Sequence, residues 1–387
     1  MSEFDGVKVL LVDGGDRQTL PLAKAFKKLG CIVTTLNGSR LDLGYVSRYP
    51  DKKILDKTIH NDKAAHIKAI RNCIKSKQYE LLVTTSDDTA EALSLMKDEY
   101  KDVVKIDVNS PDLFYMAYDK LNTMKACMEN GVPCPKTFFD INSAETLISR
   151  GVQFPIVAKP RKGFGAIGFH KVDDENQLRA LCEAIKDDID KYFFQEYIPQ
   201  TGTLYKCDMF VDANNEIKSK CVYSKNRWFP IDGGSSVCNV TIDRPDIIES
   251  CAKLLKAINW RGVADFDLIE DPRDGVAKII EINPRTPACV KIVFKAGVNL
   301  AKQILEFAYN KPVSLISDYD KDVRLRCIHT DVLWFLKSPN RFTSTPSWFS
   351  WRKTADQIWS WDDPLPFFTF SIQAVLKYKR EMKKRAR

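Results

Sequence analysis

Long hydrophobic runs are absent from the sequence. The nearest is the uncharged stretch Pro364–Leu376, which has 13 residues, and a spanning helix needs about 20. The first residues include Glu3, Asp5 and Lys8 and lack the basic region, apolar stretch and cleavage site of a signal peptide. The 17 glycines and 18 prolines are too few for a collagen-like or low-complexity chain. We therefore expect a cytoplasmic protein whose 387 residues form two or three domains.

Metal-binding cysteine and histidine spacings are also absent. The 11 cysteines are scattered without a CxxC motif, and the four histidines do not pair with them at zinc spacing. Cys327 and His329 are the one close pair, and two ligands do not make a site. Reduced thiols are therefore expected, as is usual in the cytoplasm.

Positive charge is concentrated at the end of the chain. Residues 341–387 hold ten Lys or Arg and four Asp or Glu, so they carry +6 of the total formal charge of +8. A nucleic-acid enzyme usually carries basic stripes through its core domains. We therefore predict that the protein has no nucleic-acid partner.

The same C-terminal segment is aromatic. Five of the seven tryptophans lie between Trp334 and Trp361. From Phe368 onward, apolar residues recur at helical spacing among lysines and arginines. This pattern fits an interfacial membrane anchor at the inner face of the membrane. A helix packed on its own domain is the alternative, because most amphipathic helices serve that purpose.

Strand and helix patterns alternate in the first hundred residues. Strands are expected at Val7–Val12, Cys31–Thr35 and Glu80–Thr85, with helices at Thr19–Leu29, Ile67–Ile74 and Asp87–Met96 between and after them. This alternation predicts a parallel α/β sheet. Gly14-Gly15 follows the first strand, and a tight turn explains it better than a phosphate loop. A further helix is predicted over Phe114–Asn130, closed by Gly131.

A glycine-rich stretch, Gly163–Gly168, matches GxGxxG. Strand patterns lie on both sides of it, whereas a dinucleotide-binding loop runs from a strand into a helix. This context indicates a hairpin flap whose backbone N–H groups can wrap a triphosphate. A flexible surface hairpin would look the same. Lys159 ends the strand before the flap, and Lys120 lies in an earlier polar break, so both could place a cation near phosphates.

A second hairpin, Gly262–Asn283, carries acidic residues. Because side chains alternate along a strand, Asp265 and Asp267 share one face, and Glu281 and Asn283 share one face of the partner strand. Such an oxygen cluster suits magnesium bridging phosphates. Arg285 would add a planar cation for a transferring phosphoryl group. A solvated acidic hairpin is the alternative interpretation.

Taken in order, these elements resemble the ATP-grasp superfamily of carboxylate–amine ligases. The matching elements are Lys120, Lys159-Pro160 with the flap Arg161–Gly168, Gln195–Ile198, Asp265-Phe266-Asp267, and Glu281–Arg285. The resemblance implies an ATP-grasp fold of mixed α/β and α+β class. Its expected parts are an N-terminal parallel α/β domain (1–112), a central domain with the lid (113–198), a C-terminal antiparallel-sheet domain (199–330) and a basic tail (331–387).

The resemblance also implies roles for individual residues. ATP and Mg²⁺ (or Mn²⁺) are the implied cofactors, and Arg285, Lys159 and Asn283 are the implied catalytic residues. Metal would be held by Asp265 or Asp267, with Glu281 and Asn283. The implied nucleotide contacts are Lys120, Lys159, Gly163, Phe164, Gly165, Ala166, Gly168, Gln195, Glu196, Tyr197, Ile198 and Lys206. The usual acidic ribose contact has no match, because Leu204 lies near its place.

Substrate contacts are predicted opposite the flap, at Lys225, Arg227, Gly233, Gly234 and Ser235, where a solvated loop is the alternative. The expected reaction joins a carboxylate to an amine through an acyl phosphate. Narrower likenesses suggest ligases of cell-envelope polysaccharide or peptide-like metabolite synthesis. A scaffold with a degenerate ATP site and a carbamoyl-phosphate-synthase-type enzyme are the alternatives, and a homodimer is left open.

Overall fold

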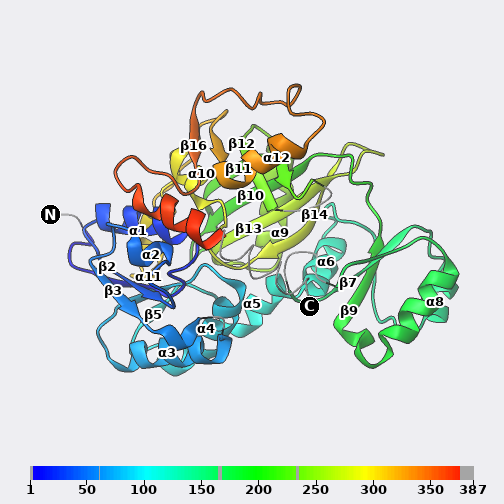
Figure 1. The fold of residues 1–387 in the computed structure, drawn as a ribbon. Coiled ribbons are helices and arrows are strands. Elements are labelled where there is room, and N and C mark those ends of the chain that lie inside the picture. The colour runs from blue at the N-terminus through cyan, green and yellow to red at the C-terminus, as the bar shows by residue number, and fades with distance from the viewer. Residues whose placement is uncertain (1–2, 61, 164–167, 232–234, 375–387) are drawn as a thin grey trace, which may run out of the picture.

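The computed structural model describes residues 3–60, 62–163, 168–231 and 235–374. Three β-sheets follow one another along this part of the chain, with five, four and seven strands. In Figure 1 the five-stranded and four-stranded sheets lie to either side below the seven-stranded sheet. The expected α/β and α+β organisation is therefore present.

The first sheet is parallel throughout. Its strands are β1 (Lys8–Leu11), β2 (Ile32–Asn37), β3 (Lys52–Leu55), β4 (Leu81–Val83) and β5 (Lys105–Ile106), in the order β3-β2-β1-β4-β5. The helices of this domain are α1 (Thr19–Lys28), α2 (Leu43–Val46), α3 (Lys63–Lys75) and α4 (Asp87–Tyr100), with a short 3₁₀ turn at Lys57–Ile59. The predicted parallel sheet is confirmed; β3 and β5 were not predicted, because each is short and rich in lysine.

The turn after β1 is tight, as expected. A Cβ on Gly14 would lie 2.1 Å from the side-chain oxygen of Asn37 and 2.5 Å from the Leu36 carbonyl oxygen. Only glycine fits so close to the neighbouring strand. Gly14 therefore allows the turn after β1 to pack against the end of β2.

The predicted helix Phe114–Asn130 is two helices, α5 (Pro111–Tyr118) and α6 (Lys120–Glu129). Asp119 separates them with an extended backbone, and its carboxylate accepts a hydrogen bond from the N–H of Leu121. The same carboxylate binds Arg161 at 2.6 Å. A cap and a distant ion pair therefore break a pattern that looks continuous in sequence.

The four-stranded sheet forms the smallest domain. Its strands are β6 (Thr137–Phe138), β7 (Ile156–Pro160), β8 (His170–Val172) and β9 (Tyr192–Glu196), in the order β6-β9-β7-β8. Helices α7 (Ala144–Ser149) and α8 (Glu175–Ala184) cover it, with a 3₁₀ helix at Lys186–Lys191. Strands β7 and β8 pair antiparallel on either side of the glycine-rich stretch, so the predicted hairpin is confirmed.

The seven-stranded sheet has the order β14-β13-β10-β11-β12-β15-β16. The strands are β10 (Leu204–Val211), β11 (Ile217–Phe229), β12 (Ser235–Thr241), β13 (Gly262–Glu270), β14 (Ala277–Asn283), β15 (Arg324–Arg326) and β16 (Thr354–Asp356). All pairs are antiparallel except β15 with β16. The accompanying helices are α9 (Pro245–Ala257), α10 (Val290–Lys295), α11 (Leu300–Ala308) and α12 (Ile328–Lys337).

The predicted boundary at residue 330 is wrong. Strand β16 pairs with β15, so residues up to Asp356 belong to the large sheet. A last helical stretch, residues 365–374, ends the described chain, and the basic residues of 375–387 lie outside it. In the part of the chain that the structure describes, the helices are all too short or too polar to span a bilayer.

Candidate active site

The two acidic strands pair as the alternation of side chains requires. Asp265 on β13 lies opposite Asn283 on β14, and Asp267 lies opposite Glu281. The Asn283 amide donates to the Asp267 carboxylate at 3.1 Å. Asp265 is fully buried, and Asp267 is 8% exposed. The four residues predicted to bind metal therefore form one cluster on the face of the seven-stranded sheet.

Lysines neutralise this cluster from the adjoining strands. The Lys206 ammonium on β10 lies 2.6 and 2.7 Å from the two Asp265 oxygens and 2.9 Å from Asp267. Lys225 on β11, the strand beyond β10, also bonds Asp267. Burial alone would raise the pKa of Asp267, but the two lysines outweigh it and hold that pKa well below its usual range. Lys206 is thus held by carboxylates, and its predicted contact with the nucleotide remains a prediction.

A third aspartate on this face was not predicted. Asp208 lies two residues from Lys206 on β10, directly opposite Asp265, and is 2% exposed. Burial, and then the Asp265 carboxylate, raise the pKa of Asp208 well above its ordinary value. Burial beside a second carboxyl group therefore favours the neutral form of Asp208. Its two-residue spacing from Lys206 is the sequence signal that could have identified it.

Lys120 and Lys159 bring positive charge to Glu281. Lys120, the first residue of α6, lies 3.3 Å from a Glu281 oxygen and donates to the Gly163 carbonyl at 2.5 Å. Lys159 at the end of β7 donates to the Gln195 side chain at 2.9 Å. Burial and the neighbouring Lys120 lower the pKa of Lys159 to about 8, against the attraction of Glu281. The structure thus places both predicted phosphate-binding lysines beside the predicted metal ligands.

The predicted adenine-binding segment, Gln195–Ile198, ends β9 and leaves it. Its N–H groups at Glu196 and Tyr197 already donate to the Lys136 and Pro155 carbonyls. Adenine would therefore have to use other backbone groups of this segment. The Gln195 side chain donates to Thr137 and accepts from Lys159, so it orients the lysine.

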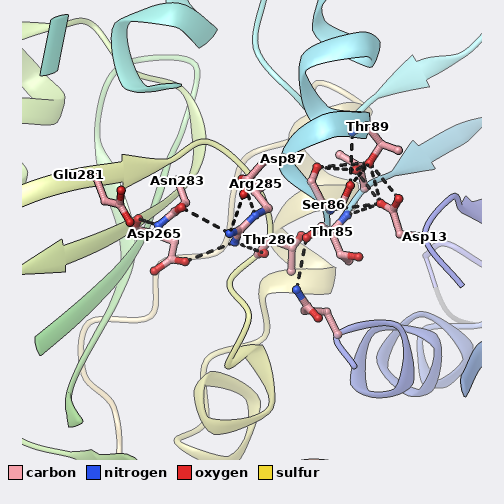
Figure 2. Close-up of polar contacts among 12 residues, drawn as sticks. Asp13, Thr85, Ser86, Asp87, Thr89, Asp265, Glu281, Asn283, Arg285 and Thr286 are labelled. Carbon is pink, nitrogen blue, oxygen red and sulfur yellow. Dashed lines mark hydrogen bonds and ion pairs between the residues drawn. The ribbon is translucent and has the colours of Figure 1, made fainter. Parts of the chain in front are cut away.

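Arg285 joins the acidic cluster to the N-terminal domain. Its guanidinium donates to Asp87 at the start of α4 at 2.8 Å, and it lies 3.4 Å from the Asn283 side-chain oxygen and 3.5 Å from Asp265. Figure 2 shows it between Asp265 and Asn283 on one side and Asp87 on the other. Asp87 was predicted only as the start of a helix.

A hydroxyl-rich cluster continues from Asp87. The Asp13 carboxylate accepts hydrogen bonds from the Thr84 and Thr89 hydroxyls and from the N–H groups of Thr85 and Ser86 (Figure 2). Asp13 and Thr84 follow the neighbouring strands β1 and β4. The carboxyl ends of parallel strands are where ligands bind in such sheets, and this rule could have identified the cluster from the sequence.

Asp16 and Arg17 lie in the same turn. Burial and the neighbouring Asp13 raise the pKa of Asp16 to about 6. The Arg17 guanidinium donates to the Gln357 side chain at 3.0 Å. The turn after β1 therefore offers one cation, Arg17, and one weakly acidic carboxyl group, Asp16, which lies near Arg285.

Arg227 is not placed for the predicted substrate contact. It is 1% exposed and donates to both Asp331 oxygens, at 2.8 and 3.0 Å, and to the Pro346 carbonyl at 2.8 Å. A guanidinium with its donors engaged this way anchors α12 and the following loop to the sheet. The sequence could not reveal this because Asp331 lies 104 residues further along the chain.

Several predicted contacts lie outside the described residues. These are the flap residues Phe164, Gly165 and Ala166 and the substrate residues Gly233 and Gly234. Gly168, at the end of the flap, has a φ of +76° and lies against Pro160. Ser235 is exposed at the start of β12, so its predicted substrate contact remains a prediction.

The donor set fits a hard divalent cation, although the cluster is not a complete coordination sphere. Among residues 3–60, 62–163, 168–231 and 235–374, no three His, Cys, Asp or Glu side chains converge closely enough to hold a metal ion. Magnesium is usually held by one or two carboxylates together with phosphates and water. Glu281 and Asn283 can supply protein oxygens of this kind together with an aspartate of β13, although lysines bond both oxygens of Asp265 and of Asp267.

The architecture is that of an α/β protein with two further sheets, and the charged site lies between its domains. Solved structures of known proteins share this fold. With a biotin carboxylase–β-γ-ATP complex from Campylobacter jejuni, the chain superposes with a TM-score of 0.69 at 15% identity, over 82% of this chain and 74% of that one. Residues 117–289 match the family model of the ATP-grasp domain. The resemblance to the ATP-grasp superfamily that the sequence predicted is thus confirmed.

Two characterised ligases are similar in sequence. D-aspartate ligase from Enterococcus faecium is 27% identical over 263 residues, 62% of this chain and 61% of that protein. Tetrahydromethanopterin:alpha-L-glutamate ligase from Methanocaldococcus jannaschii is 28% identical over 210 residues, 51% of this chain and 68% of that protein. The chain thus spans about three fifths to two thirds of the length of these relatives.

Proposed function

We propose that the protein is an ATP- and magnesium-dependent ligase that joins a carboxylate to an amine through an acyl phosphate. The position of Arg285 carries this proposal, because it links the acidic cluster on β13 and β14 to Asp87 and the hydroxyl-rich edge of the N-terminal sheet. A phosphoryl group bound by this arginine would lie between nucleotide and substrate. The two ligase relatives support the same class of reaction.

In the first step, a substrate carboxylate oxygen attacks the γ-phosphorus of ATP, and the bond to the bridging oxygen breaks to release ADP. Lys120 and Lys159 would bind the phosphates, and Arg285 the transferring group. Asp267, Glu281 and Asn283 would hold magnesium or manganese, which supplies charge neutralisation when bound. We choose Asp267 over Asp265 because Asp265 is fully buried, whereas Asp267 is 8% exposed and lies opposite Glu281.

In the second step, an amine nitrogen attacks the carbonyl carbon and phosphate leaves, which forms the amide. The amine must lose a proton. Asp16, with a pKa of about 6, is a suitable acceptor at neutral pH. Because the two ligases are named for aspartate and glutamate, we propose that one substrate is an amino acid. A role in cell-envelope or peptide-like metabolite synthesis rests on the sequence resemblance alone.

Glu281→Gln and Lys159→Ala are expected to reduce phosphate release at least about 100-fold, because each removes a charge from the phosphate and metal region. Phosphate release is measured with Mg-ATP and a panel of amino acids and uronic acids. Glu270→Gln, on β13 but bonded to Arg244 and Tyr205, is the control. Undiminished turnover in both site variants would exclude this mechanism. If Mg-ATP raises the melting temperature of the protein but is not consumed, the result would favour the alternative function, a scaffold with a degenerate ATP site.

We also propose that the C-terminal region docks on anionic membrane. Large apolar side chains are exposed in this region: Trp361 is 88%, Phe342 68% and Leu336 65% exposed. The other large apolar side chains exposed in this region are Val332, Leu333, Phe349, Trp351, Leu365, Phe368 and Ile372. Seven Lys or Arg and one Glu follow in residues 375–387. Aromatic side chains beside basic ones suit the headgroup region of an anionic bilayer.

The expected result is binding to phosphatidylserine-containing vesicles that weakens about tenfold or more in Phe342→Ser/Trp361→Ser, because buried aromatic area supplies the affinity. Vesicle co-flotation measures it. Leu95→Ser removes a 59% exposed leucine on α4 and serves as the control. Equal binding by the control and the double variant would contradict membrane docking. Concentration-dependent dimers without vesicle binding would show that the surface joins two copies of the chain.

A further inference from the structure

A second cavity lies apart from the candidate active site. It has a volume of about 530 Å³ and is formed by three stretches of chain: α1 with Tyr49, residues 291–299, and residues 358–363. No residue of its lining belongs to the acidic cluster or to the phosphate-binding lysines described above. The volume lies within the range of small-molecule sites.

Four lysines line this cavity. Lys24 and Lys28 lie one helical turn apart on α1, and Lys291 and Lys295 lie one turn apart on α10. Residues four apart share one face of a helix, so two helices each place a pair of lysines along the same cavity. The rest of the wall is largely apolar and includes Leu20, Pro21, Phe294, Val298 and Ile358.

These ammonium groups are only partly neutralised. Lys24 pairs with Asp362 at 2.6 Å. Asp363 also lines the cavity, but its carboxylate accepts hydrogen bonds from the Ser47 hydroxyl and the Arg48 N–H. Lys28 and Lys295 are exposed, and the described residues offer neither of them an ion pair or hydrogen bond. Positive charge therefore exceeds negative charge around the cavity.

Lys291 is the most enclosed of the four. Its ammonium donates to the Trp359 carbonyl at 2.8 Å and to the Ser360 hydroxyl at 3.2 Å, and no carboxylate of the described residues bonds it. Burial lowers its pKa to about 8; Lys295 and Lys24 also lower it, and Asp356 and Asp362 oppose them. Converging like charges cost free energy that a bound anion would offset.

We propose that this cavity binds a small phosphate-bearing molecule with an apolar or aromatic body, at a site distinct from that for ATP. Several lysines directed at one space suit a phosphate group, which accepts hydrogen bonds from point charges on several sides. The apolar wall between the two lysine pairs would receive the body of the ligand.

Pyridoxal 5′-phosphate tests the proposal because it is an aromatic phosphate with an aldehyde. A neutral lysine amine condenses with the aldehyde and releases water, and added borohydride reduces the imine to a stable secondary amine that mass spectrometry locates. With saturating Mg-ATP to protect the candidate active site, we expect saturable labelling of Lys291. We also expect inorganic pyrophosphate to protect Lys291 from the label.

Matched variants complete the test. Lys28→Ala/Lys295→Ala removes two exposed ammonium groups and is expected to raise the half-saturating concentration about tenfold. Lys68→Ala/Lys75→Ala removes the same charge from exposed positions on α3 and should leave it unchanged. The proposal fails if labelling is unsaturable and spread over surface lysines, if pyrophosphate gives no protection, or if the two double variants behave alike. None of these outcomes depends on whether the protein consumes ATP.

Discussion

Replacing Arg285 with methionine is expected to lower ATP-dependent phosphate release by about 1000-fold, while the affinity for Mg-ATP changes within about threefold. The reason is positional. Arg285 contacts Asn283 and Asp87, between the proposed nucleotide and substrate sites, whereas Lys120 and Lys159 stay in place to bind ATP. A side chain that binds the transferring phosphoryl group stabilises the transition state more than it stabilises the complex with bound ATP.

Two further variants separate catalysis from folding. Arg285→Lys keeps the charge but loses the planar guanidinium, so it cannot bond Asp87 and Asn283 together. Its activity should fall between that of the unaltered protein and that of Arg285→Met. Arg71→Met removes an exposed arginine paired with Glu99 on α4 and controls for lost charge. Turnover and Mg-ATP affinity are measured beside the melting temperature. A folded Arg285→Met protein with unchanged turnover would show that Arg285 has no part in the reaction.

The acidic pair of strands could be predicted because strand alternation is a local property. A period of two places Asp265 with Asp267 and Glu281 with Asn283, and the observed register pairs the two sets directly. The flap hairpin was predictable for a similar reason, since strand patterns flank it. Chain order then added Lys120 and Lys159, which the structure brings to Glu281.

Partners far along the chain could not be predicted. The spacing of Lys225 and Arg227 suggests one shared role, yet a bulge in the pairing of β11 with β12 separates them. Lys225 bonds Asp267, and Arg227 bonds Asp331. In the same way, the sequence pattern predicts that Asp119 lies within a helix. In the structure its carboxylate binds Arg161 and caps the start of α6, which separates two helices. Such outcomes depend on tertiary contacts that no sequence period encodes.

Lys206 is the buried cation whose loss should most affect stability. Its ammonium bonds both Asp265 oxygens and one Asp267 oxygen, and its residue is 8% exposed. Lys206→Met keeps most of the volume but leaves Asp265 with Arg285, 3.5 Å away, as its nearest remaining cation. Removing one partner of a buried ion pair costs about 3–5 kcal/mol, so we expect a marked fall in melting temperature.

Magnesium should restore part of that stability in the variant. With the ammonium gone, Asp265 and Asp267 lose the cation that they share and keep only Arg285 and Lys225, which favours binding of a divalent cation in its place. The melting temperatures of Lys206→Met and of the unaltered protein are compared with and without magnesium chloride at constant ionic strength. Lys218→Met, which removes a partly exposed lysine paired with Asp212 and Glu216, should cost about 1 kcal/mol or less. If Lys206→Met melts no lower than Lys218→Met, or gains nothing from magnesium, then Lys206 is not the cation that stabilises this pair of carboxylates in the fold.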